Sequence, residues 1–119
     1  MANLLRANLE EANLHRANLF RAELKGANLQ GAHLIEANLR EANLREANLH
    51  RADLRGADLL EINLHKADLH EAFLAGANLF MADLRSANAC EAIFLEVDLQ
   101  GGNLQEADLR MAQLHDARL

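Results

Sequence analysis

The amino-acid sequence predicts an all-β solenoid, in which the chain winds into a rod of stacked coils. The first observation is a five-residue unit, Ala-Asn-Leu-x-x, which repeats without a change of frame from Ala2 to Leu119. The second is that this unit fits neither the period of a helix nor that of a strand. The third is the composition, because half of the residues are hydrophobic but only 3% are aromatic. A core of small and medium-sized aliphatic side chains is therefore expected.

The third position of the repeat is the most regular one. It holds leucine at 22 of its 24 sites, and the two exceptions are Ala89 and Phe94. The first position is alanine except at Ile62, Val97 and Gly102. The second position is asparagine at 12 sites and aspartate at 6. Because apolar side chains are the ones that fold inward, we expect the first and third positions inside and the other three outside.

Two regular structures compete with a solenoid, and the period excludes both. Ala, Leu, Glu and Arg favour helix and the chain contains no proline. A five-residue step on a helix, however, turns the leucines by about 140° around the axis, so they form no stripe that a partner element can bury. In a continuous strand, an odd period sends successive leucines to opposite faces. A short extended segment followed by a turn in every repeat keeps both inward positions on one side, and stacked coils then pair their backbones.

This pattern resembles the pentapeptide repeat family, and the resemblance covers residues 2–119. It implies a right-handed, quadrilateral parallel β-helix with four repeats, or twenty residues, in each coil. On that pitch residues 1–119 form a single domain of about six coils, and a spacing of ~4.8 Å makes the rod roughly 29 Å tall. Phe73 and Ile93, two departures at the second position, stand twenty residues apart and agree with this period.

Ala89 and Phe94 hold the third position in consecutive repeats, so on this pitch they lie on neighbouring sides of one coil. The larger ring of Phe94 is expected to compensate for the leucine that is missing at Ala89. We therefore expect Phe94→Ala to destabilise the protein more than a typical Leu→Ala replacement.

The four sides of the rod are named here after their first leucine, as the Leu4, Leu9, Leu14 and Leu19 sides. The charges of Lys, Arg, Asp and Glu amount to +1, −4, −2 and −1 on these sides, within a net charge of −6. The acidity is concentrated on the Leu9 side. A negative surface of this kind disfavours direct binding of nucleic acid.

Outward apolar side chains on two neighbouring sides form the predicted partner-binding surface, the apolar corner. They are Ile35, Phe73, Ile93 and Leu95 on the Leu14 side, and Phe20, Leu60, Phe80 and Met81 on the Leu19 side. A contiguous exposed patch of such residues is typical of a binding site for a partner or a second copy. The alternative is a set of scattered surface hydrophobes, which most folded proteins carry.

His50, His70 and Cys90 form the one column of metal-ligand residue types, and they lie on the Leu9 side. A zinc site needs ligands that converge tetrahedrally, whereas neighbours along a column are held apart by the interstrand spacing. We therefore expect surface decoration there, with no metal and no cofactor. The second-position asparagines and aspartates are expected to bond to the turn backbone and to form ladders. A convex rod offers no cleft, so no catalytic residue is predicted.

The sequence predicts a non-enzymatic interaction or scaffold module. Its partner is an unidentified protein or a second copy, bound through the apolar corner or an exposed coil end. The resemblance implies one alternative, because some pentapeptide repeat proteins act on DNA gyrase as acidic mimics of duplex DNA. No apolar run approaches the ~20 residues that span a bilayer. A single cysteine, Cys90, fits a reducing compartment, so we expect a cytoplasmic protein without membrane contact.

Overall fold

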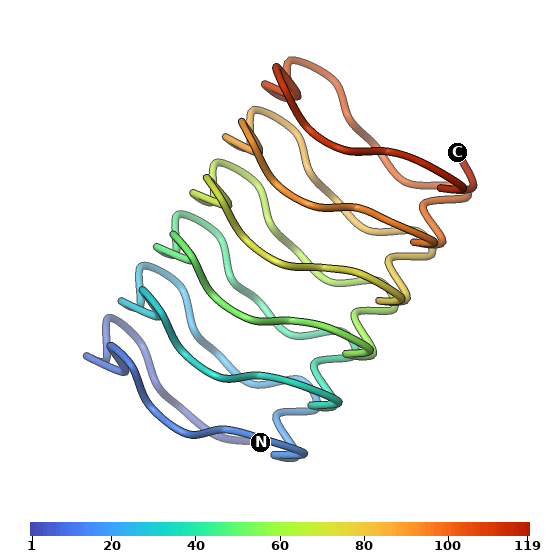
Figure 1. Ribbon diagram of the computed structural model, residues 1–119. Coiled ribbons are helices and arrows are strands. Elements are labelled where there is room, and N and C mark those ends of the chain that lie inside the picture. Colours follow the sequence, from blue (N-terminus) through green and yellow to red (C-terminus); the bar gives the residue numbers. More distant parts are fainter.

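The computed structural model describes residues 1–119 as a rod of stacked coils, with the two termini at opposite ends (Figure 1). The rod measures 32 × 22 × 22 Å. It is built from short extended segments and turns and contains no helix, so nothing in the structure meets the length and hydropathy of a membrane-spanning helix. The predicted solenoid is confirmed.

Parallel pairing between coils gives the rod its period. The second residue of each repeat forms a single-residue parallel β-bridge with the residue twenty positions later, from Asn3–Glu23 to Asp98–Arg118. Backbone hydrogen bonds flank every bridge: in the middle of the rod, the Leu44 N–H donates to the carbonyl of Asn63 at 2.8 Å. Four repeats therefore complete one coil, and the inter-coil bonds satisfy the backbone along each side.

The corners of the coil are turns at the fourth and fifth positions. In every turn except the one before Val97, the first-position N–H bonds to the third-position carbonyl of the preceding repeat, as in the 3.0 Å bond from Ala47 to Leu44. Every fifth-position residue, from Arg6 to Asp116, has a positive φ between 53° and 72°. A positive φ at the third residue of the turn is what a type II turn requires. Eighteen of these residues are not glycine, so the packed coil holds them in a conformation that L-residues rarely adopt.

The first and third positions fill one continuous core of 33 buried residues, which contains no polar side chain. Its members run from Leu19 to Leu99. Leucines nearer the two ends of the rod are partly buried against it: Leu4, Leu9, Leu14, Leu104, Leu109 and Leu114. Ala89 and Phe94 are both fully buried. Leucine and alanine therefore point inward on all four sides, as the repeat predicts.

The coil that contains Phe94 is the least regular one. Elsewhere the first-position N–H closes a turn, but Val97 makes no such bond to the carbonyl of Phe94. The inter-coil bond from the Asp98 N–H to the Ala77 carbonyl is the longest in the backbone, at 3.3 Å. A phenylalanine ring and a β-branched valine thus occupy a space built for leucine and alanine, and the turn between them opens.

The second-position side chains stabilise the turns. All eighteen asparagines and aspartates at this position accept a hydrogen bond on Oδ1 from the N–H two residues later. Asparagine amides also donate along the rod, from Asn28 to Asn8 at 3.3 Å and from Asn48 to Asn28 at 3.2 Å. The expected turn bonds and ladders are confirmed.

Removing one of these side chains is expected to weaken the rod. Asn38→Ala deletes the bond from the Arg40 N–H and the bond to Asn18, so we expect a loss of about 1 kcal/mol in the free energy of unfolding, measured by urea titration. His33→Ala is the matched control, because His33 holds the same position one repeat earlier and accepts no turn bond. Equal losses in the two variants would show that the turn bond does not stabilise the fold.

Acid is expected to destabilise the rod through its surface ion pairs. The Arg110 side chain hydrogen-bonds Asp108 at 2.7 Å and lowers the pKa of this carboxyl to about 2. A carboxyl whose folded pKa lies below its unfolded value stabilises the fold above the unfolded pKa, and this contribution disappears as the pH falls through the folded pKa. We therefore expect Tm to fall as the pH is lowered from about 4 to about 2. Arg110→Gln should make this fall smaller in thermal melts, and an unchanged slope would contradict the assignment.

Candidate functional site

The eight predicted partner-binding residues all lie on the outside of the rod, but the structure divides them. Phe73, Ile93 and Leu95 gather on the Leu14 side and are called the Phe73 strip. Phe73 and Ile93 are bridged to each other in adjacent coils, and the Phe73 side chain is 41% exposed. Ile35 lies three coils before Leu95 in the same column, with Arg55 and Ala75 between them, so it is not part of the strip.

A second group, called the Phe80 strip, consists of Leu60, Phe80 and Met81. These residues lie at the edge of the Leu19 side that is farther from the Leu14 side. Leu60 and Phe80 lie in adjacent coils, and Met81 is 52% exposed. The second-position residues of the Leu19 side, such as Asn78, separate this strip from the Phe73 strip. Phe20 is apart from both, in the first coil, where the Arg21 guanidinium lies 4.9 Å from its ring centroid.

The Phe73 strip interrupts the hydrogen bonding of the turns, whereas the Phe80 strip does not. Phe73 and Ile93 replace the usual asparagine or aspartate, so the N–H groups of Ala75 and Leu95 have no side-chain acceptor. In the Phe80 strip the acceptors are retained, and the Phe80 N–H donates to Asn78 at 3.1 Å. The Phe73 strip therefore lacks turn hydrogen bonds that would stabilise the fold, whereas the Phe80 strip keeps them.

An open hollow adjoins the Phe73 strip at the corner between the Leu14 and Leu19 sides. Its lining is mostly polar: Gly76, Ala77, Asn78, Glu96, Asp98, Asp116 and Arg118. Gly76 leaves room there, because an added Cβ would meet no atom within 4 Å. Three carboxylates against one guanidinium make the hollow suitable for a basic side chain. Sequence analysis missed it because the acids come from two different sides of the rod and meet only at the corner.

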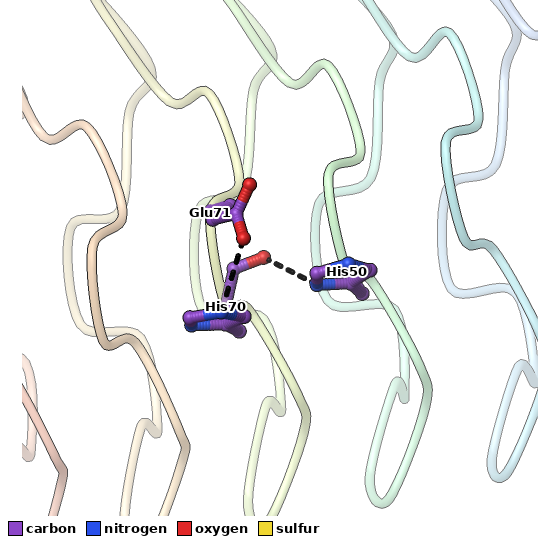
Figure 2. Close-up of side chains that lie close together, drawn as sticks. All are labelled: His50, His70 and Glu71. Carbon is purple, nitrogen blue, oxygen red and sulfur yellow. Dashed lines mark hydrogen bonds and ion pairs between the residues drawn. The ribbon is translucent and has the colours of Figure 1, made fainter.

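A cluster of polar side chains lies on the Leu9 side (Figure 2). The rings of His50 and His70 stack at 9°, with centroids 5.2 Å apart. His50 Nδ1 lies 3.1 Å from the His70 carbonyl, and His70 Nδ1 lies 2.9 Å from the Cys90 carbonyl. The Glu71 carboxylate reaches back to His70 Nε2 at 3.1 Å. The column expected to be surface decoration thus acquires a carboxylate from the following position.

Glu71 is itself held by a neighbour in the preceding coil. The Arg51 Nε donates to one carboxylate oxygen at 2.7 Å, and the other oxygen faces His70. The hydrogen bond from Arg51 lowers the pKa of Glu71, so this group is a carboxylate at neutral pH. His70, Cys90 and Glu91 form a similar set one coil later.

One known protein family matches the chain over its whole length, residues 1–119. The profile of the family "Pentapeptide repeats" matches overlapping segments at 1–26, 22–59, 47–80, 57–94 and 82–119. The chain belongs to the pentapeptide repeat family. The right-handed, four-sided β-helix implied by the resemblance is thereby confirmed as its fold. No protein of curated function matches the chain at a significant level.

Solved pentapeptide repeat structures resemble the chain over most of its length. A protein from the cyanobacterium Cyanothece 51142 is 30% identical, covers 98% of this chain and 87% of its own, and has a TM-score of 0.64. HetL from Nostoc sp. strain PCC 7120, involved in heterocyst differentiation regulation, is 36% identical over 98% of this chain, with a TM-score of 0.49. The present chain spans 61% of the length of HetL.

A fluoroquinolone resistance protein shares the fold at lower identity. QnrB1, a plasmid-mediated fluoroquinolone resistance protein, is 23% identical to the chain, with a TM-score of 0.52. The match covers 85% of this chain and 64% of QnrB1. At this identity the similarity concerns the β-helix alone. The family profile and the Cyanothece structure identify a pentapeptide repeat protein, and they leave its partner to be inferred from the surface.

Proposed function

We propose that this pentapeptide repeat protein is a non-enzymatic interaction module that binds a protein partner through the Phe73 strip. One observation carries the proposal: Phe73 and Ile93 replace a side chain that eighteen other repeats use to accept a turn hydrogen bond. The replacement gives up local stability and leaves an aromatic ring exposed. Six repeats lack the asparagine or aspartate, and only Phe73 and Ile93 replace it with an apolar side chain. An exposed apolar residue that breaks a local rule is typical of a functional surface.

The hollow beside the strip supports a partner of defined chemistry. An aliphatic or aromatic side chain packs on Phe73 and Ile93, and a lysine or arginine next to it enters the hollow among Glu96, Asp98 and Asp116. Apolar anchors supply most of the affinity in such interfaces, while charge complementarity supplies selectivity. The partner is therefore a segment in which a large apolar residue stands beside a basic one.

A peptide array tests whether the strip and the hollow recognise such a segment. It contains peptides with an apolar residue next to lysine, and matched peptides in which glutamate replaces lysine. We expect the lysine peptides to bind preferentially, and Phe73→Asn to weaken this binding by about tenfold or more. Asparagine is the consensus residue at this position, so the variant restores a turn bond and should be at least as stable as the natural protein in urea titrations.

Phe80→Asn is the matched control, because it removes a similarly exposed ring from the Phe80 strip, and it should leave binding unchanged. Equal binding of the two peptide classes, or equal losses in the two variants, would contradict the proposal. Sedimentation of the natural protein and Phe73→Asn also shows whether the strip binds a second copy. A dimer that is lost in Phe73→Asn would replace the peptide-binding proposal with self-association.

A second candidate function rests on the charge of the Leu9 side. Its acids include Glu10, Glu11 and Asp68, and they give this side the largest negative charge of the four. We propose, as the alternative to peptide binding, mimicry of duplex DNA toward DNA gyrase. Membership of the pentapeptide repeat family suggests gyrase as the target, and the charge of the Leu9 side supports the mimicry. The corresponding test is a gyrase supercoiling assay at two salt concentrations. Inhibition that fades with salt would support mimicry, because salt screens exposed charges, and no inhibition at either concentration would reject it. We also propose a cytoplasmic location, which the free thiol of Cys90 supports.

A further inference from the structure

We propose that His50, His70 and Glu71 bind a divalent transition-metal ion, with Zn²⁺ as the ion that their chemistry fits. Each side chain offers one ligand atom, and the three atoms lie within 4.8 Å of one another. Two imidazoles and one carboxylate are a ligand set that zinc accepts, with water in the fourth position. The site lies on the Leu9 side, away from the Phe73 strip, and does not depend on the function proposed for that strip.

The backbone selects the same tautomer for both rings. A carbonyl oxygen accepts a hydrogen bond only from a protonated nitrogen, so the contacts at 3.1 and 2.9 Å assign a proton to Nδ1 of His50 and of His70. Nε2 is then the nitrogen of each ring that faces a metal. On His70 this atom contacts Glu71, and the ion would replace that contact. Ligating histidines commonly donate their other ring N–H to a backbone carbonyl in this way, because that bond fixes the tautomer and the ring orientation.

The distances require only side-chain movement. His70 Nε2 and the Glu71 oxygen are 3.1 Å apart, close to the separation of about 3.3 Å between two ligands of one tetrahedral zinc. The ligand nitrogen of His50, which lies within 4.8 Å of the other two ligand atoms, has to move closer. The side chains of His70 and Glu71 are 29% and 33% exposed, so an ion can reach both from solvent. In Figure 2 the three side chains lie together on one face, across two adjacent coils.

The surroundings favour a cation. The Leu9 side has a net charge of −4, which attracts a divalent ion. Arg51 binds one oxygen of Glu71 and leaves the other for the metal, as an outer partner of a ligating carboxylate does. His70 also belongs to the set with Cys90 and Glu91, but Glu91 is exposed, whereas all members of the first set are half-buried. The first set therefore holds its ligands more firmly.

Calorimetric titration of the untagged protein with Zn²⁺ tests the site, with Co²⁺ absorption as a second readout of nitrogen and oxygen ligation. The natural protein should bind one ion, and Zn²⁺ should raise its Tm. His50→Gln and His70→Gln should each weaken Zn²⁺ binding by about tenfold or more and remove the Tm shift. Glutamine already stands in the same column at position 30, so these variants are expected to fold as the natural protein does.

His115→Gln is the matched control. Its Nε2 lies 3.1 Å from Asp116, as His70 lies from Glu71, but the residue in the preceding coil is leucine instead of histidine. This variant and Cys90→Ser should bind Zn²⁺ as the natural protein does. The proposal is overturned if the natural protein binds no ion, or if His50→Gln binds normally. It is also overturned if Cys90→Ser loses binding that His50→Gln keeps, because the ion then occupies the other set.

Discussion

Leu54→Asp is expected to abolish the cooperative unfolding transition. Leu54 lies in a middle coil, is 1% exposed and belongs to a core without polar side chains. A carboxyl group there has no partner, and together with the lost leucine its burial costs roughly 5 kcal/mol or more. This is comparable with the whole stability of many small domains. Because each coil contacts only its neighbours, damage in the middle also uncouples the two ends. Circular dichroism during urea titration measures the result.

Leu114→Asp is the control for position in the rod. Leu114 lies in the same column as Leu54 but in the last coil, where it is only partly buried. We expect this variant to keep a cooperative transition with a lower midpoint, since the coils before it remain stacked. Equal disruption by the two substitutions would show that the rod does not behave as a series of neighbouring units.

Phe94→Ala is expected to cost about 3 to 5 kcal/mol in the free energy of unfolding. Phe94 is fully buried, and the third-position residue before it is already the small Ala89, so the truncated coil would contain two adjoining voids. Leu74→Ala is the matched control, because Leu74 is equally buried in the same column one coil earlier. The loss should be larger for Phe94→Ala, and equal losses in urea titrations would show that the ring does not compensate for the missing leucine.

A double-mutant cycle tests the compensation directly. Ala89→Leu alone overpacks the coil and should cost about 1 to 3 kcal/mol. Combined with Phe94→Leu it restores the consensus core, so the double variant should be more stable than the sum of the single effects predicts. The same variant relieves the crowding that opens the turn at Val97. Additive effects would mean that the two positions are independent.

The core could be predicted from sequence because a single frame assigns every residue a direction. Leu24 and Leu84 lie sixty residues apart, yet both hold the third position and both are fully buried. The backbone of the corners could not be predicted. Residues such as Arg16 and Glu46 do not favour a positive φ, and only the glycines at some fifth positions indicate it. The stacked coil imposes that conformation, so it is a tertiary effect.

The surface was predicted only in part, because side chains from different sides meet at corners. Assigning columns identified Phe73 and Phe80 as outward residues, and both are exposed. It did not show that Asn78 lies between their two strips. Nor did it bring Glu71 to His70, since that contact joins consecutive positions across a turn. The repeat assigns each residue to a coil and to a side of the rod, but it does not give the orientation of the side chain.

Because the coil has four sides, the loss of one repeat affects the core and the surface of the rod differently. The first and third positions face inward in every repeat, so a chain that lost one repeat between His50 and His70 would still keep these positions inside. Outside, every later residue would rotate by a quarter turn relative to the earlier ones. His70 would then leave the column of His50, while the Phe73 strip would keep its own arrangement. Gain or loss of single repeats can therefore rearrange binding surfaces during evolution without a new hydrophobic core.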